Sequence, residues 1–125
     1  MNFFSQHKFF FYSLNLILIS LYFSPTSFMG IFIHNDLYLY SQINTEFKVS
    51  VNHIYAFIIF SVVGYLTYVK LKHFIFLSIY LVSISVILEL THLLIPYRGF
   101  EFADLFGNII GVTIGFIIIF FYKKI

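Results

Sequence analysis

Residues 89–115 read ELTHLLIPYRGFEFADLFGNIIGVTIG, and the rest of the chain is organised around this stretch. Its two ends lie within apolar runs, while its middle carries four of the chain's twelve Asp, Glu, Lys and Arg residues: Glu89, Arg98, Glu101 and Asp104. Charged side chains within or beside membrane-length segments are costly, and they therefore mark candidate functional positions. The stretch predicts two apolar helices joined by a short polar loop.

The composition indicates a membrane protein. Hydrophobic residues make up 61% of the chain and charged residues 10%, whereas soluble domains average about 45–50% and about 25%. A chain of 125 residues forms one domain and has room for about four spans of ~20 residues. Cysteine is absent, which excludes disulfides, thiolate metal sites and cysteine nucleophiles. We therefore predict an all-α, four-helix transmembrane bundle comprising residues 1–125.

Apolar runs separated by polar breaks place the four helices. We expect them at residues 9–33, 52–69, 74–95 and 104–122. The first helix either continues through Pro25 with a kink, because proline removes a backbone donor, or ends near Phe23. Asn15 within it is expected to hydrogen-bond a neighbouring helix. A cleaved signal peptide is the competing interpretation of this segment, although no clean small-x-small cleavage site follows it.

Lysine and arginine are distributed unevenly between the two ends of this four-span arrangement. Five of the seven fall at the end that carries both termini, namely Lys8, Lys70, Lys72, Lys123 and Lys124. Lys48 and Arg98 fall at the other end. Because short, positively charged segments stay on the cytoplasmic side, we predict that both termini are cytoplasmic.

Polar or small residues form one stripe on each of the last two predicted helices. On the third helix, Ser85, Glu89 and His92 recur at helical spacing and share a face. The stripe on the fourth helix comprises Asp104, Gly107, Asn108, Gly111 and Gly115. Its glycines, the glycine stripe, form two overlapping G-x-x-x-G patterns, which let a neighbouring backbone approach closely. We expect the two stripes to face each other and to form a polar pocket near the connecting loop.

The polar pocket is expected to collect side chains from three helices and one loop: His53, Glu89, His92, Arg98, Asp104 and Asn108. Glu89 beside His92 suits general acid–base chemistry, and the planar fork of Arg98 suits a phosphate or carboxylate. The structural alternative is that Glu89 pairs with His92 or Arg98 only to fix helix register. Asp104 would then serve to cap the fourth helix.

A divalent metal is a lesser alternative for the same pocket, because histidines and carboxylates are the ligands of hydrolytic zinc sites. The residues concerned are His53, Glu89, His92 and Asp104. The leading prediction is that no cofactor is bound. The sequence contains no Ser-x-Gly elbow, P-loop or nucleic-acid motif, so no nucleic-acid partner is expected.

These residues resemble the pattern of the VanZ-like family of small bacterial membrane proteins. That pattern consists of a Glu, a polar residue three positions later, Pro-x-Arg, an Asp, an Asn four positions later, and two glycines spaced by four. The matching positions are Glu89, His92, Pro96, Arg98, Asp104, Asn108, Gly111 and Gly115, with His53 opening the preceding helix. The resemblance covers residues 52–122, and His92 departs from it, because the family usually carries Gln there.

The resemblance implies a multi-pass protein of the bacterial cytoplasmic membrane, linked to the cell envelope and to tolerance of glycopeptide antibiotics such as teicoplanin. Together with the polar pocket, it predicts recognition of an anionic phospholipid headgroup or a lipid-linked cell-wall precursor in the outer leaflet. Two alternatives stay open. One is a membrane enzyme that acts on a lipid-linked phosphate with Glu89 and His92 as acid–base residues. The other is a small subunit of a larger membrane complex that docks through the glycine stripe.

Overall fold

The computed structural model of the protein describes residues 3–24, 49–68, 71–96 and 98–124. They form four helices and no strand: α1 (Phe3–Phe23), α2 (Val51–Thr67), α3 (Leu71–Thr91) and α4 (Phe102–Lys124). The prediction of an all-α chain with four helices is confirmed for this part of the protein. Helix α1 ends at Phe23, and its predicted continuation to residue 33 falls outside the described residues.

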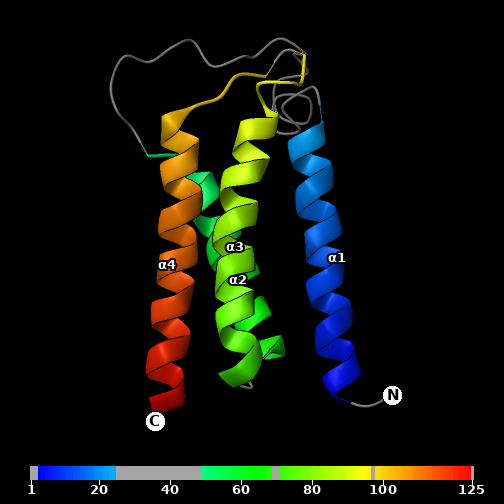
Figure 1. Ribbon diagram of the computed structural model, residues 1–125, viewed down its shortest axis with the longest axis vertical. Coiled ribbons are helices and arrows are strands. Elements are labelled where there is room, and N and C mark those ends of the chain that lie inside the picture. Colours follow the sequence, from blue (N-terminus) through cyan, green and yellow to red (C-terminus); the bar gives the residue numbers. More distant parts are fainter. Residues whose placement is uncertain (1–2, 25–48, 69–70, 97, 125) are drawn as a thin grey trace.

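The four helices run alternately in opposite directions (Figure 1). The beginning of α1 and the end of α4 lie at one end of the bundle, together with the end of α2 and the beginning of α3. The opposite end is called the site end below. It is defined by Tyr22 in the last turn of α1, His53 in the first turn of α2, Glu89 in the last turn of α3 and Asp104 in the first turn of α4.

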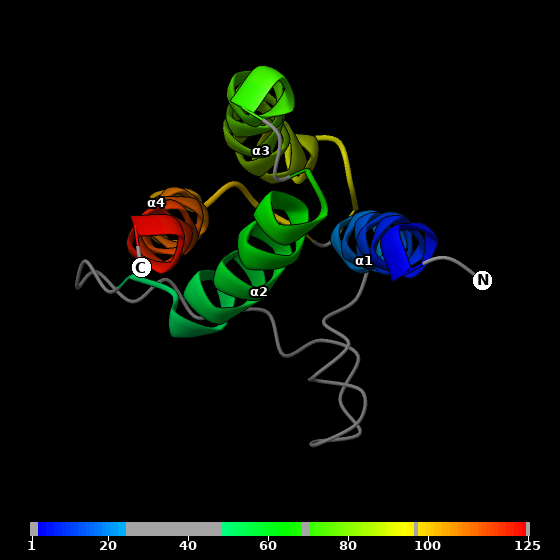
Figure 2. The ribbon, with the colours of Figure 1, turned by 90° about the horizontal axis from the view of Figure 1, so that it is seen from below.

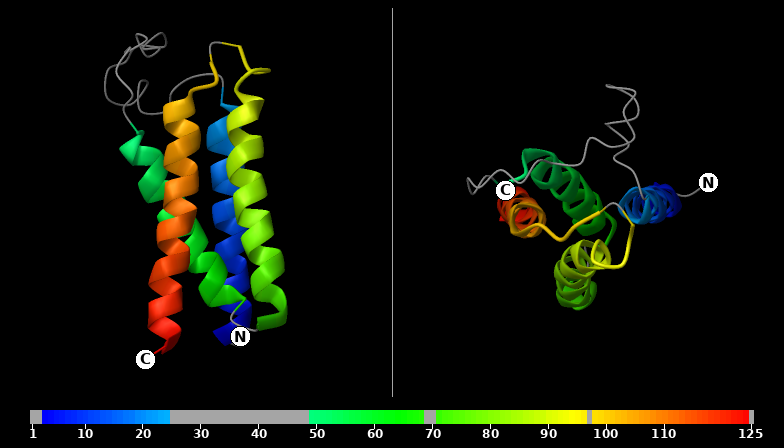
Figure 3. Two further views of the ribbon diagram at one scale, coloured as in Figure 1. Left: turned by 60° about the vertical axis from the view of Figure 1, so that its left-hand side comes forward. Right: turned by 90° about the horizontal axis from the view of Figure 1, so that it is seen from above.

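Helix α2 is the central element of the bundle. It runs obliquely to the other helices (Figure 3) and lies between α1 and α4 when the bundle is viewed along its length (Figure 2). Its most extensive packing is against α4. Towards α1, the ring of Phe60 stacks on that of Phe11 with the centroids 5.4 Å apart. Phe57, which is fully buried, packs edge-on against Phe60. The core between α1 and α2 thus includes several packed aromatic rings.

A main-chain hydrogen bond joins the beginnings of α2 and α4. The N–H of Ser50, directly before α2, donates to the carbonyl of Ala103 in the first turn of α4 over 3.2 Å. Because both helices start from this contact, His53 and Asp104 lie close to each other, each within the first turn of its own helix. The pairing of two helix starts therefore builds one side of the site end.

Helix α3 ends at Thr91, before the predicted end at residue 95. The N–H groups of His92, Leu93 and Leu94 instead donate to carbonyls three residues earlier, over 3.1, 3.1 and 2.9 Å. This tighter turn is consistent with the approach to Pro96, because proline disfavours the α conformation of the residue that precedes it. The turn keeps His92 next to the last turn of α3, where Glu89 lies.

The glycine stripe of α4 packs against α2, and the prediction that it faces the third helix is wrong. A Cβ atom added to Gly111 would lie 2.6 Å from the carbonyl oxygen of Ile54 and 2.7 Å from Cβ of Phe57. One added to Gly107 would lie 2.7 Å from the carbonyl oxygen of Ser50. The absence of side chains is what lets the two backbones approach this closely. Because α2 covers the glycine stripe, the stripe is not a free docking face for another subunit.

Two described helical segments are long and apolar enough to cross a membrane: His73–Thr91 and Phe102–Tyr122, each with a mean hydropathy of 2.2. Helices α1 and α2 contribute the shorter apolar segments Lys8–Phe23 and Val51–Thr67. A core helix of a soluble protein would be mostly buried, whereas only 28% and 33% of the two long segments are buried. A helix that is apolar on its exposed face as well is typical of a membrane span, so the fold is compatible with a membrane protein.

We predict that Gly111→Ala destabilises the bundle, although alanine is the better helix former. The added methyl group would meet the main chain of α2 at Ile54 and Ile58, and a packed backbone cannot move aside as a flexible side chain can. Overpacking of this kind costs about 1–3 kcal/mol. The measurement is the midpoint of thermal unfolding of the purified protein in detergent.

Thr113→Ala is the matched control for this substitution. Thr113 lies in the same helix but is exposed, and its hydroxyl donates only to the carbonyl of Ile109 one turn earlier. Its loss should leave the unfolding midpoint nearly unchanged. If Gly111→Ala behaves in the same way, α2 and α4 do not pack through the glycine stripe.

Candidate functional site

Asn108 is the residue through which all four helices are joined. It lies fully buried in α4. Its Nδ2 group donates to the carbonyl of Ser85 in α3 over 3.1 Å. Its Oδ1 atom accepts from the hydroxyl of Tyr22 in α1 over 2.8 Å and lies 2.9 Å from Nδ1 of His53 in α2. One amide therefore connects each of the other three helices to α4.

These contacts determine which nitrogen of His53 carries a proton. The carbonyl of Ser85 can only accept, so the amide nitrogen of Asn108 must face it and Oδ1 must face His53. Because Oδ1 is also only an acceptor, Nδ1 of His53 is the donor of that hydrogen bond. The Tyr22 oxygen, 2.8 Å from the same Nδ1, can share this proton. In the neutral ring, Nε2 is then an unprotonated acceptor.

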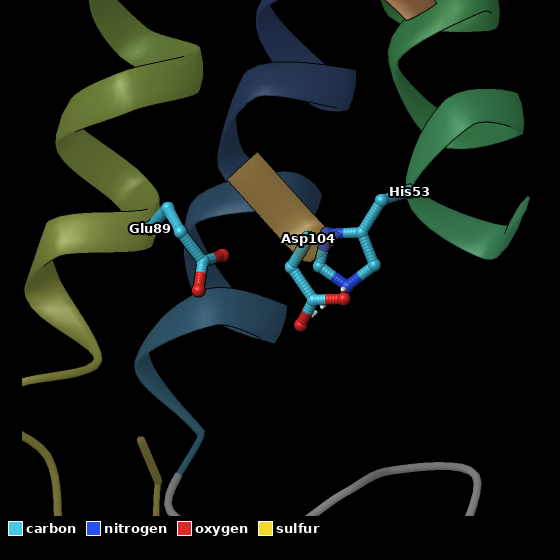
Figure 4. A group of neighbouring side chains, drawn as sticks. All are labelled: His53, Glu89 and Asp104. Carbon is cyan, nitrogen blue, oxygen red and sulfur yellow. Dashed lines mark ion pairs between the residues drawn. The ribbon is translucent and has the colours of Figure 1, made fainter. Parts of the chain in front are cut away.

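This second nitrogen of His53 faces Asp104. Nε2 lies 3.6 Å from Oδ2 of Asp104, and the two side chains are 21% and 20% exposed. Figure 4 shows these two groups side by side, with the carboxylate of Glu89 directed towards them. One atom from each of the three residues, all capable of binding a metal, lies within 4.8 Å of the other two. The site is therefore accessible from its His53–Asp104 side.

Glu89 is fully buried, yet the described part of the chain offers a hydrogen-bond partner to only one of its carboxylate oxygens. Oε1 accepts from the main-chain N–H of Glu101 over 3.1 Å and lies 3.3 Å from Nδ1 of His92. Among the described residues, Oε2 has no hydrogen-bond partner, and neither has Nε2 of His92, which is also buried. Leaving a buried polar atom unpaired costs about 1–3 kcal/mol. Both atoms therefore favour the binding of a proton, an ion or a polar ligand group.

Tyr22 contacts both His92 and Asn108. It is absent from the site predicted from the sequence. Its ring stacks on that of His92, with the centroids 5.0 Å apart and the planes 13° apart, while its hydroxyl bonds to Asn108. A tyrosine at the end of an apolar run also fits an interfacial aromatic belt. The signal that identifies Tyr22 is its helical spacing from the other buried residues of α1: Phe11, Asn15 and Leu18.

Arg98 holds the end of α1 in place. From the segment between α3 and α4, its Nε atom donates to the carbonyl of Ser24 over 3.2 Å, and its Nη2 atom lies 3.5 Å from the carbonyl of Leu21. Carbonyls at a helix C-terminus lack partners within the helix, and a cation is favourable there. These bonds give Arg98 a structural role, and its role as an anion-binding residue stays a prediction.

The structure thus brings most of the predicted pocket into one group, which we call the polar cluster: Tyr22, His53, Glu89, His92, Asp104 and Asn108. Arg98 contacts the same end of α1 that carries Tyr22. The glycine stripe contributes indirectly, since a Cβ atom on Gly107 would lie 3.1 Å from Cβ of His53. The close contact between α2 and α4 is what brings His53 within reach of Asn108.

A groove of about 440 Å³ lies elsewhere, between α1 and α3. Its walls are mainly aromatic and aliphatic and include Phe11, Ile19 and Phe76. Asn15 lines it, donating to the carbonyl of Phe11 and accepting from the hydroxyl of Tyr80 in α3. The predicted role of Asn15 as a helix–helix hydrogen-bonding residue is therefore confirmed. No residue of the polar cluster lines this groove, so the two features are distinct.

Comparison with protein-family models, with characterised proteins and with solved structures gives no match. The resemblance to the VanZ-like family therefore stays a prediction that rests on the residues and their spacing. The chemistry of the site has to be inferred from the polar cluster itself.

Proposed function

We propose that all four helices cross a bacterial cytoplasmic membrane as a multi-pass bundle. Large apolar side chains that face outwards on every helix support this, among them Leu16, Ile59, Phe76 and Phe121. Apolar surface of this extent is unfavourable in water and favourable against lipid, where helices satisfy their own backbone groups. Helix α2 has 17 residues and is therefore about 26 Å long, close to the ~30 Å hydrocarbon core.

In this proposal the termini are cytoplasmic and the site end lies in the outer leaflet. Lys8 in α1, Lys72 in α3 and the Lys123–Lys124 pair in α4 belong to the parts of these helices remote from the site end. Positively charged segments of this kind stay on the cytoplasmic side. The polar cluster is then at the level of the outer headgroups.

We predict that a cysteine at the site end is accessible from outside the cell and that one at the opposite end is not. The chain has no cysteine of its own, so single substitutions report cleanly. Phe100→Cys should react with an impermeant thiol reagent in intact cells or spheroplasts, while Leu71→Cys should react only after lysis. The reverse pattern would place the polar cluster in the inner leaflet and contradict the orientation.

We propose further that the polar cluster recognises the headgroup of an anionic phospholipid or of a lipid-linked cell-wall precursor. The observation that carries this proposal is a fully buried, half-satisfied Glu89 next to the partly exposed side chains of His53 and Asp104. Such headgroups carry hydroxyl or ammonium donors close to a phosphate. These donors would form hydrogen bonds to the carboxylate oxygens of Glu89 and Asp104, and the guanidinium of Arg98 would lie near the phosphate.

Membership of the VanZ-like family, with a role in the cell envelope and in teicoplanin tolerance, is part of the same proposal. Support comes from the residues that carry the sequence pattern. Glu89, His92, Asp104 and Asn108 are separated along the chain but belong to one polar cluster, together with His53. A pattern that only stabilised individual helices would not require this convergence.

An enzyme that acts on a lipid-linked phosphate is the second candidate, and the Glu89–His92 pair favours it. Nδ1 of His92 lies 3.3 Å from a carboxylate oxygen of Glu89, while Nε2 has no hydrogen-bond partner within residues 3–24, 49–68, 71–96 and 98–124. A carboxylate that orients an imidazole leaves the far nitrogen able to accept or deliver a proton. Release of phosphate from a lipid substrate, lost in His92→Gln, would favour the enzyme over a binding protein.

We predict that Glu89→Gln preserves the fold and impairs function. The amide has nearly the shape of the carboxylate, and its oxygen can still accept from the N–H of Glu101. The measurements are folded yield, teicoplanin tolerance in a host that shows it, and retention of phospholipid or precursor by native mass spectrometry. We expect folded protein with reduced tolerance and reduced lipid retention.

Glu101→Gln is the matched control, because it neutralises a neighbouring carboxylate but keeps the main-chain N–H that bonds to Glu89. It should retain more function than Glu89→Gln. Full tolerance and full lipid retention in Glu89→Gln would show that Glu89 has only a structural role.

A further inference from the structure

Three hydrogen-bond acceptors converge within the polar cluster, two of them on its accessible side. The first is Nε2 of His53, because Nδ1 donates to Asn108. The second is Oδ2 of Asp104, 3.6 Å from Nε2. Glu89 provides the third, with one atom of each residue within 4.8 Å of the other two. Two of these groups are carboxylates, which repel each other at short range unless a positive charge lies between them.

The hydrogen bonds of Glu89 are a second reason to expect a positive charge between the carboxylates. Its contacts with the N–H of Glu101 and with His92 both involve Oε1. Oε2 is fully buried and has no hydrogen-bond partner in the part of the chain that the structure describes. A buried carboxylate oxygen is unfavourable unless it is protonated, hydrogen-bonded or bound to a cation. A cation held between Glu89, Asp104 and His53 would supply the missing partner.

We propose that His53, Glu89 and Asp104 form a binding site for a divalent transition-metal cation. Such ions bind imidazole nitrogen and carboxylate oxygen at about 2.0–2.2 Å, which places two ligand atoms of a tetrahedral site about 3.3–3.6 Å apart. One atom of each residue lies within 4.8 Å of the other two, so the three side chains would have to draw together by up to about 1.5 Å on binding the ion. One imidazole with two carboxylates suits Zn²⁺ or Mn²⁺ better than Ca²⁺ or Mg²⁺, which prefer oxygen ligands alone.

The surroundings of the three ligands match those of metal sites. A metal-binding histidine usually donates its other ring nitrogen to an oxygen, which fixes the tautomer and the ring orientation. Asn108 and Tyr22 do this for His53. A ligating carboxylate is likewise held by hydrogen bonds. In Glu89, Oε1 accepts such a bond from the main-chain N–H of Glu101. The ligands are therefore held in position by their neighbours.

Three protein ligands leave a position for water or for a polar group of another molecule. His53 and Asp104 are about one-fifth exposed, so this position would be reached from the site end. The inference goes beyond the proposed function, because the cation would bind whether or not the polar cluster also recognises a lipid.

Protons are the competing occupants of the same acceptors. An imidazolium at His53 paired with Asp104, or a protonated Glu89, would also relieve the repulsion. The two cases differ in a measurable way, since a metal site binds an added ion with a fixed stoichiometry and releases protons as it does so.

The test is isothermal titration calorimetry with Zn²⁺ and with Mn²⁺ on the full-length protein in detergent, after treatment with a chelator. The expected result is one ion bound per chain, with binding weakened at least about tenfold in Asp104→Asn and in Glu89→Gln. Tyr22→Phe removes only a hydroxyl that orients His53, and should weaken binding about 10–100-fold.

His73→Gln is the matched control for His53→Gln. His73 is exposed near the beginning of α3, at the opposite end of the bundle. The His73→Gln variant should bind the ions as the wild type does, while His53→Gln should bind them at least about tenfold more weakly. Absence of binding to the wild type, or equal binding to the wild type and all variants, would overturn the proposal.

A second measurement guards against variants that fail to fold. Because a ligand that binds only the native state stabilises it, Zn²⁺ should raise the unfolding midpoint of the wild type and of His73→Gln. At the same Zn²⁺ concentration it should raise that of folded Asp104→Asn clearly less, and an equal rise there would contradict the assigned ligands. Cysteine labelling does not depend on this outcome, and lipid retention by the chelator-treated wild type tests headgroup recognition without the cation, so the two proposals can fail separately.

Discussion

The amide of Asn108 is the interaction on which the arrangement of the four helices depends. In an apolar bundle, a buried amide must satisfy both its donor and its acceptor. Asn108 does so by donating to Ser85 in α3 and accepting from Tyr22 in α1 and His53 in α2. Sliding any helix by one residue would break one of these bonds. Apolar contacts alone tolerate such shifts more easily, because they have no direction.

The polar cluster consists of a satisfied half and an unsatisfied half. Around Asn108, the described polar atoms find partners, and this half fixes the orientation of the His53 ring. Around Glu89 and His92, one buried oxygen and one buried nitrogen find no partner among the described groups. Tyr22 connects the halves by its ring and its hydroxyl. The satisfied half thus holds the unsatisfied half in position, which is the requirement for a site that binds a ligand or an ion in a defined geometry.

Part of this arrangement can be predicted from the sequence. Polar residues are rare in apolar helices, so the spacing of Glu89 and Asn108 identifies the helix faces that carry the site. The glycine stripe indicates that a backbone approaches α4 but not which one, and α2 takes the place predicted for α3. Tyr22 escapes prediction because a tyrosine at the end of an apolar run fits the membrane interface equally well. The partners of Arg98 are main-chain carbonyls of α1, which no side-chain pattern reveals.

The central claim is that Asn108 fixes the tautomer of His53 and leaves its Nε2 atom as an acceptor facing the carboxylates. Nitrogen-15 NMR of the His53 ring in the reconstituted, metal-free protein tests it most directly. The spectrum should be recorded at mildly alkaline pH, where an imidazole is ordinarily neutral. The account predicts a proton on Nδ1 and none on Nε2, with the Nδ1 signal changed in Asn108→Leu. A neutral ring protonated on Nε2 would contradict the hydrogen-bond assignment and, with it, the convergence of three acceptors.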